Sequence, residues 1–304
     1  MEKLKEKILN LKKEKNAVIL AHLYQLPEIQ DIADFVGDSY NLSKQASQTD
    51  AKIIVFCGVY FMAETAAIIS PDKKVLLPEI DAGCPMADMI TIADIEKLKI
   101  ENPKAIIITY INSNAEIKAY SDIVCTSSNA VKIVKKLPKC QKDIIFVPDK
   151  YLGNYIAKQN LDRNIILFNG YCNVHSKILP DDVKNLKEKH PNSFVLVHPE
   201  CRGEVIDMAD EVLSTTGMIN FVKNSAKKEF IICTEIGIMY KLEKDNPNKI
   251  FYHISKLAIC PNMKKTTLEK VLFSLEDLKY EIKVDKNIAI LANSAINKMF
   301  ELSK

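Results

Sequence analysis

The sequence predicts an α/β protein built from three three-layer α/β/α domains, each with a small parallel sheet, related by pseudo-threefold symmetry around a common centre. Two observations support this fold. Chemically similar residues recur at a fixed step of 88 positions, and a fixed period indicates one structural unit repeated along the chain. Within each unit, short runs rich in Val and Ile alternate with helical stretches, as in parallel sheets covered by helices on both faces.

The repeat is clearest in its polar positions, which keep one register without a gap. The domains are therefore expected at residues 1–84, 85–172 and 173–260, each ending at a cysteine. The repeated columns are Cys84, Cys172 and Cys260; His22, Tyr110 and His198; Tyr24, Asn112 and Glu200; Ser39, Ser127 and Thr215; and Asp34, Asp122 and Asp210.

The elements of each unit are expected in the order strand, helix, polar crossing, helix, strand, helix, strand. The opening strands are predicted at residues 18–21, 105–109 and 194–197, because these runs are short and apolar. In the first unit the later elements are predicted at residues 26–36, 42–47, 53–57, 61–69 and 74–77.

Two segments lie outside the regular unit. Residues 3–15 carry apolar side chains at helical spacing and predict a helix with a solvated basic face. After the last cysteine, a helix, a strand and a helix at residues 267–278, 280–284 and 287–302 resemble the opening of a fourth unit. Residues 261–304 are therefore expected to pack back on the first domain and close the ring.

Composition excludes several classes of protein. The chain has 304 residues with 47% hydrophobic and 27% charged side chains, which is ordinary for a globular protein, and its net charge of +3 does not indicate nucleic-acid binding. No apolar run is long enough to span a bilayer and no signal peptide is evident, so we expect no membrane partner and a cytoplasmic location. The eight cysteines then favour core residues or metal ligands over disulfides.

The polar columns are predicted to share one edge of the sheets. His22, Tyr110 and His198 each end the first strand of their unit, and each cysteine of the repeated column follows the last strand. Ligands of open parallel sheets bind beyond the carboxyl ends of the strands. The repeated aspartates lie before this edge, so we interpret them as structural turn formers or caps.

The hydroxyl column points to anion binding. Ser39, Ser127 and Thr215 each precede a predicted helix, where a hydroxyl can cap the helix and also contact a ligand. Free N–H groups at helix starts attract anions. The chain has only Arg163 and Arg202, so these helix starts are expected to hold carboxylate or phosphate groups.

Three thiols from a threefold ring would meet at one place. An iron–sulfur cluster normally takes four thiolates, so three would leave one iron open as a Lewis acid. Zinc bound by three thiolates is the competing interpretation. The wide spacing of the three cysteines favours the cluster, whereas Cys57 and Cys233 are interpreted as core residues, and the remaining cysteines are expected to be inert.

Several longer motifs surround the repeated positions. They are Ala21-His22-Leu23-Tyr24, Asp38-Ser39, Gly83-Cys84-Pro85-Met86-Ala87, Tyr110-Ile111-Asn112-Ser113, Cys125-Thr126-Ser127-Ser128-Asn129-Ala130, Gly170-Tyr171-Cys172-Asn173-Val174-His175, His198-Pro199-Glu200-Cys201, Ser214-Thr215-Thr216-Gly217-Met218 and Cys260-Pro261-Asn262-Met263. Together these motifs resemble those of the quinolinate synthase family, the iron–sulfur enzymes of NAD biosynthesis, over nearly the whole chain.

The resemblance implies a transferase that condenses iminosuccinate with dihydroxyacetone phosphate to give quinolinate, phosphate and water. It implies one 4Fe-4S cluster held by Cys84, Cys172 and Cys260, with one open iron. It also implies possible coupling to L-aspartate oxidase or aspartate dehydrogenase. The substrate-binding residues it implies are His22, Ser39, Tyr110, Ile111, Asn112, Ser127, His198, Pro199, Glu200 and Thr215.

Catalytic roles are a hypothesis at this stage. Glu200 is the expected general base, Tyr24 or Tyr110 would pass protons, and His22 belongs to the same catalytic group. His175, close to Cys172, could orient the site. Two other functions would use the same thiols: a different 4Fe-4S-dependent hydro-lyase, or a metal-binding protein without catalytic activity.

Overall fold

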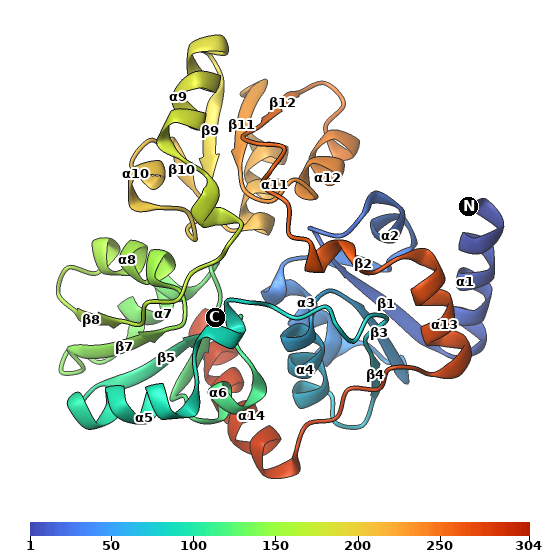
Figure 1. Cartoon of the computed structure of the whole chain (residues 1–304), viewed down its shortest axis with the longest axis horizontal. Helices are drawn as coiled ribbons and strands as arrows, with labels where there is room; N and C mark the ends of the chain where they lie inside the picture. The colour runs from blue at the N-terminus through green and yellow to red at the C-terminus, as the bar shows by residue number, and fades with distance from the viewer.

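The computed structural model describes all 304 residues and contains three separate four-stranded sheets whose strand pairs are all parallel (Figure 1). The strand orders are β2-β1-β3-β4, β6-β5-β7-β8 and β10-β9-β11-β12, so each sheet has the same topology. Figure 1 shows the three units arranged around a common centre. The predicted fold class is confirmed.

Each unit runs helix, strand, helix, strand, helix, strand, helix, strand and a short 3₁₀ helix. The first contains α1 (Glu2–Glu14), β1 (Ala17–His22), α2 (Pro27–Ile32), β2 (Phe35–Gly37), α3 (Ser39–Gln48), β3 (Ile53–Cys57), α4 (Tyr60–Ile69), β4 (Lys74–Leu76) and η1 (Ala87–Met89). The second contains α5 (Ile92–Glu101), β5 (Ile106–Tyr110), α6 (Ala115–Ala119), β6 (Ile123–Cys125), α7 (Ala130–Lys136), β7 (Asp143–Val147), α8 (Lys150–Gln159), β8 (Asn164–Leu167) and η2 (His175–Lys177).

The third unit repeats this order, and two further helices complete the chain. The third contains α9 (Pro180–Lys189), β9 (Phe194–Val197), α10 (Gly203–Ile206), β10 (Glu211–Val212), α11 (Thr215–Asn224), β11 (Glu229–Cys233), α12 (Ile238–Asp245), β12 (Ile250–His253) and η3 (Asn262–Lys264). The final helices are α13 (Leu268–Asp277) and α14 (Lys286–Ser303). None of the helices combines the length and apolar character that crossing a membrane requires.

The helix predicted at residues 26–36 of the first unit is too long, and the third unit shows the same short helix followed by an edge strand. Helix α2 ends at Ile32 and α10 at Ile206, and the edge strands β2 and β10 follow. The chain turns extended directly after α2, at Ala33. These edge strands have only three and two residues, too few for an apolar pattern to identify them.

The repeated aspartates fasten these edge strands to the first strand of each unit. The Asp34 carboxylate accepts a hydrogen bond from the Ile19 N–H at 2.8 Å, and the Asp34 N–H donates to the Ile19 carbonyl at 2.9 Å. Asp122 and Asp210 make the same pair of contacts in the second and third units. The aspartate column is therefore structural, as its position indicated.

The C-terminal segment divides between two units. Helix α13 packs on α1 and β3 of the first unit. Helix α14 packs mainly on α6, β6 and α7 of the second unit and also contacts α4 of the first, so the expected return of residues 261–304 to the first domain remains a prediction. The apolar stripe of α14 completes the core of the second unit, with Ala292, Ala295, Ile296 and Met299 fully buried. The predicted strand at residues 280–284 forms only one isolated bridge, between Leu76 and Glu281.

The first and third units share a core. The largest apolar cluster joins Leu20 and Phe56 of the first sheet to Leu196 and Phe230 of the third. This continuous core fixes the carboxyl ends of the two sheets relative to each other. The exact domain boundaries proposed from the 88-residue repeat remain a prediction.

We predict that Asp122→Ala lowers the free energy of unfolding by about 1–3 kcal/mol, because the buried Ile107 N–H loses a charged acceptor. Asp122→Asn, which keeps one acceptor oxygen, should fall between this variant and the wild type. Urea unfolding followed by circular dichroism measures the effect, with Asp72→Ala at an exposed turn as the control. Equal stability of Asp122→Ala and this control would contradict the structural role.

Candidate functional site

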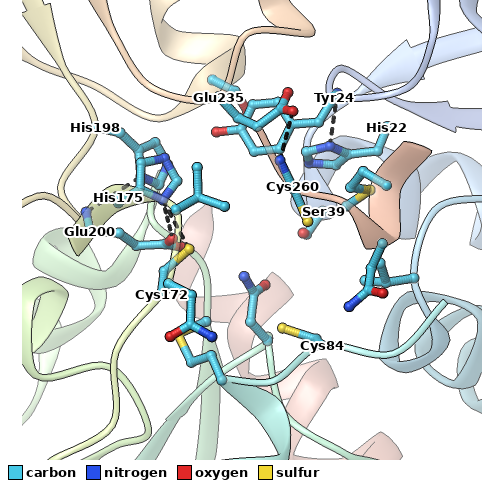
Figure 2. Close-up of a pocket in the computed structure, with 18 of the residues that line it drawn as sticks. His22, Tyr24, Ser39, Cys84, Cys172, His175, His198, Glu200, Glu235 and Cys260 are labelled. Atoms are coloured by element: carbon cyan, nitrogen blue, oxygen red, sulfur yellow. Dashed lines mark hydrogen bonds and ion pairs between the residues drawn. The ribbon is translucent and has the colours of Figure 1, made fainter. Parts of the chain in front are cut away.

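A central cavity of about 260 Å³ lies between the carboxyl edges of the three sheets (Figure 2). It collects side chains from all three units, including four of the repeated columns. The predicted site residues that line it are Cys84, Cys172, Cys260, His22, Tyr110, His198, Tyr24, Asn112, Glu200, Ser39, Ser127 and Thr215. Ile111 and Pro199 are buried beside these residues but do not line the cavity, so their part in binding remains a prediction.

The three cysteines of the repeat stand on three sides of this cavity (Figure 2). All three are free thiols. Burial raises the pKa of Cys84 to about 12 and also raises the pKa values of Cys172 and Cys260. Such thiols keep their protons at neutral pH unless a metal displaces them, because thiolate is the form that binds metals.

Two buried carboxyl groups hold the backbone of two of these cysteines. Asp149 accepts from the Cys172 N–H at 3.1 Å, and Glu235 accepts from the Cys260 N–H at 3.0 Å. Both side chains are inaccessible to solvent. Sequence reasoning missed them because their spacing falls two residues short of the repeat, so they do not stand in one column.

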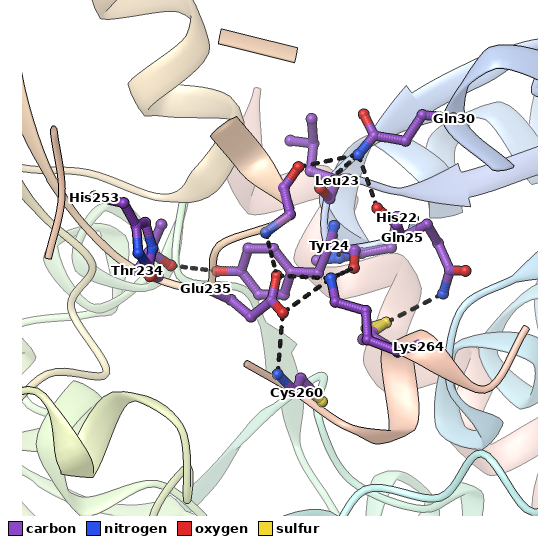
Figure 3. Close-up of polar contacts among 12 residues, drawn as sticks. His22, Leu23, Tyr24, Gln25, Gln30, Thr234, Glu235, His253, Cys260 and Lys264 are labelled. Carbon is purple, nitrogen blue, oxygen red and sulfur yellow. Dashed lines mark hydrogen bonds and ion pairs between the residues drawn. The ribbon is translucent and has the colours of Figure 1, made fainter. Parts of the chain in front are cut away.

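A polar network joins the first and third units beside the cavity (Figure 3). The Lys264 ammonium donates to the Tyr24 carbonyl and lies 3.0 Å from a carboxylate oxygen of Glu235. The Gln30 amide nitrogen donates across the same boundary to the Gly237 carbonyl at 3.1 Å. A Cβ atom at Gly237 would come within 2.8 Å of the Tyr24 backbone, so the two segments approach this closely only with glycine there.

Glu200 is the centre of a second network. One of its carboxylate oxygens accepts from the Tyr110 hydroxyl, and the other lies 2.8 Å from Nδ1 of His175. The same Nδ1 lies 3.2 Å from the Cys172 sulfur, and Nε2 of His175 lies 2.8 Å from the Thr234 hydroxyl. His175 therefore connects Cys172 to Glu200 and Thr234, and its role in orienting the site remains a prediction. Thr234 was not identified from the sequence.

The protonation state of Glu200 follows from these contacts. Burial alone would raise the pKa of Glu200, but the neighbouring His175 and its hydrogen bond outweigh burial and hold that pKa below its ordinary value. Glu200 is therefore a carboxylate at neutral pH. Burial and the nearby Glu200 charge raise the pKa of Tyr110. The Tyr110 hydroxyl therefore stays protonated and donates a hydrogen bond to this carboxylate.

The two histidines of the repeat are neutral donors. Burial lowers the pKa values of His22 and His198 to about 3. In each ring Nδ1 accepts a backbone N–H, from Tyr24 at 3.1 Å and from Glu200 at 3.4 Å. A neutral ring whose Nδ1 accepts must carry its proton on Nε2, which is then available to a bound molecule.

The repeated hydroxyls are not helix caps. The capping side chains are the preceding residues, Asp38 for α3 and Ser214 for α11. Ser127 lies three residues before α7 begins. The hydroxyl groups of Ser39, Ser127 and Thr215 make no hydrogen bond within the protein, although all three residues line the cavity.

Asn112 adds another unpaired group to the same cavity. Its side-chain oxygen is buried without a hydrogen-bond partner. A buried polar atom left without a partner costs about 1–3 kcal/mol, which a ligand or an ordered water would recover. The cavity thus presents polar groups whose partners must come from a bound molecule.

Two arrangements of ligands for a metal are possible here. Donor atoms of Cys172, His175 and Glu200 lie within 4.8 Å of one another. However, His175 and Glu200 already pair with each other and with Thr234 and Tyr110, whereas the three cysteines have no partner of comparable strength. Thiolates are soft ligands of the kind that hold iron–sulfur clusters. The three free thiols, one from each unit, therefore fit an iron–sulfur cluster.

Fold and site together define a pseudo-threefold α/β metalloprotein that presents thiols and hydrogen-bond donors in one buried cavity. Residues 6–301 match the family described as "Quinolinate synthetase A protein". The chain belongs to this family.

Similar curated proteins cover nearly the full chain. A quinolinate synthase of Caldicellulosiruptor saccharolyticus is 55% identical over 303 residues, covering 100% of this chain and 99% of the relative. One from Thermodesulfovibrio yellowstonii is 53% identical over 297 residues, covering 98% and 97%, and one from Methanosarcina barkeri is 51% identical over 294 residues, covering 97% and 96%.

If Cys84, Cys172 and Cys260 each supply one sulfur ligand from a different unit, we predict that replacing any one of them by Ser removes most of the bound iron. Iron and acid-labile sulfide, counted after anaerobic purification, measure the loss. Cys140→Ser, at an exposed cysteine outside the cavity, is the matched control and should retain wild-type iron. Full iron content in any of the three variants would remove that cysteine from the ligand set.

Proposed function

We propose that this chain is a quinolinate synthase that condenses iminosuccinate with dihydroxyacetone phosphate, releasing quinolinate, phosphate and water. The observation that carries the proposal is the enclosed cavity in which three free thiols face unpaired hydroxyl, amide and imidazole groups. Membership of the quinolinate synthetase A family supports the same reaction. A supply of iminosuccinate from L-aspartate oxidase or aspartate dehydrogenase belongs to this proposal.

The proposed cofactor is one 4Fe-4S cluster held by Cys84, Cys172 and Cys260. When bound, such a cluster supplies an open iron that acts as a Lewis acid toward a substrate oxygen and assists loss of hydroxide. Asp149 and Glu235 hold the backbone at Cys172 and Cys260 and so fix the positions of two ligands. The outer contacts of a metal site orient its ligands in this way.

Binding of the anionic substrates is assigned to the protein's neutral donors. Ser39, Ser127 and Thr215 offer hydroxyls, and α3 and α11 begin at Ser39 and Thr215, where free N–H groups favour anions. Arg163 and Arg202 both donate to backbone carbonyls and do not line the cavity. The hydroxyls and helix starts thus take the place of arginine in holding carboxylate and phosphate.

Proton transfer is assigned to Glu200 and the two tyrosines. Glu200, as a carboxylate, accepts the hydrogen bond of Tyr110, so a proton removed from the substrate can pass through the Tyr110 hydroxyl to Glu200. Tyr24 keeps its proton because burial raises its pKa, and its hydroxyl lies 2.5 Å from that of Thr234. His22, neutral and next to Tyr24, is placed to donate from Nε2 to a substrate oxygen.

The decisive experiment is anaerobic purification followed by an assay with iminosuccinate and dihydroxyacetone phosphate. We expect about four irons per chain, a visible absorption band that fades in air, and formation of quinolinate. Iron without quinolinate formation would favour another hydro-lyase. Zinc in place of iron, with no turnover, would favour a metal-binding protein and overturn the proposal.

We predict that Glu200→Gln lowers kcat by about 10²–10⁴-fold, because the amide keeps the size of the side chain but cannot take up a proton. Iron content and thermal stability, measured on the same preparation, show whether the cluster and fold survive. Near-normal turnover with a full complement of iron would show that Glu200 is not the base.

A further inference from the structure

A second pocket adjoins the central cavity. It has a volume of about 630 Å³, and Asn173 and Lys177 line both spaces. Its wall lies at the boundary between the second and third units, with Lys150 and Tyr151 at the start of α8 and Arg202 directly before α10. The two spaces therefore share part of their wall, at Asn173 and Lys177.

Three cations line the second pocket, and no carboxylate does. They are Lys150, Lys177 and Arg202. None of them forms an ion pair, whereas other lysines of the same units do, such as Lys158 with Asp207 at 2.7 Å. Uncompensated positive charge in a concave wall raises the local concentration of anions.

Two of these cations are held in place by neutral groups. The Lys150 ammonium lies 5.2 Å from the centre of the Tyr151 ring and 5.0 Å from that of Tyr171, and it donates to the Asn169 side chain at 2.9 Å. The Arg202 Nε donates to the Ser176 carbonyl at 2.7 Å, which fixes the guanidinium and leaves its terminal nitrogens without a protein acceptor. Positioned donors of this kind bind oxyanions with little loss of side-chain freedom.

We propose that this pocket is an anion-binding vestibule, formed around Lys150, Lys177 and Arg202, that holds a small oxyanion next to the central cavity. Its ligand chemistry is a doubly charged phosphate or dicarboxylate group. The identification of these anions as substrates or products in transit rests on the proposed function, since both proposed substrates and both organic and inorganic products are anionic. Lys177, shared by the two spaces, marks the route between them.

The test is isothermal titration calorimetry of the anaerobic holoenzyme with inorganic phosphate and, separately, with succinate at low ionic strength. Lys150→Gln is expected to weaken binding of at least one probe by about 3–10-fold, roughly 1 kcal/mol, and added salt should reduce the difference. Lys150→Arg keeps the charge and should restore binding, which separates loss of charge from misfolding. Lys139→Gln removes an exposed lysine outside the pocket and is the control for net charge.

The probes distinguish the possible sources of the anion. If Lys150→Gln weakens the binding of phosphate alone, the vestibule is assigned to phosphate; if it weakens the binding of succinate alone, the vestibule is assigned to dicarboxylates. Weaker binding of both probes supports the shared chemistry. Equal affinities in the wild type, Lys150→Gln and Lys139→Gln, or no binding of either probe, would overturn the proposal. Because this measurement needs no turnover, an inactive enzyme that still shows the Lys150 effect counts against the proposed reaction only.

Discussion

Three sheets turn their carboxyl edges toward one enclosed cavity, so every polar group placed there must find a partner or a ligand. Asp149, Glu235 and Thr234 supply partners within the protein, for two cysteine N–H groups and for the side chains of Tyr24 and His175. The Asn112 oxygen and the three repeated hydroxyls have no partner within the protein. These groups mark the positions where a bound molecule would supply the hydrogen-bond partner.

Charge is divided between the cavity and its surroundings. Inside, burial keeps His22 and His198 neutral, and Lys264 is paired with Glu235, so donors without net charge face the proposed substrates. Lys177 is the only lysine or arginine that lines the cavity, and it does so at the boundary with the proposed vestibule. Free cations placed outside attract anions from solution, while neutral donors inside hold these anions without the cost of a buried cation.

The 88-residue repeat predicted most of the cavity because equivalent positions in equivalent sheets reach equivalent edges. It could not identify Asp149 and Glu235, whose spacing departs from the repeat by two residues, or the edge strands, which are too short to carry an apolar pattern. The apolar stripe of α14 predicted an amphipathic helix but not which unit it would cover, because a stripe of Ala, Ile and Met fits any exposed apolar surface. The capping role expected of Ser39 and Thr215 fell to their neighbours, since capping needs the residue just before the first helical turn.

Some repeated columns have the same residue in all three units and others do not. This difference agrees with the role that each column has in the structure. The aspartate column is identical in all three units because each sheet needs the same link between its first strand and its edge strand. The cysteine column is also identical, which suits a group that can be held by three equivalent ligands around a pseudo-threefold axis. The column of Tyr24, Asn112 and Glu200 has diverged completely. Neither proposed substrate has threefold symmetry, so a cavity that must bind one face of an asymmetric molecule and move its protons in one direction requires three different side chains there.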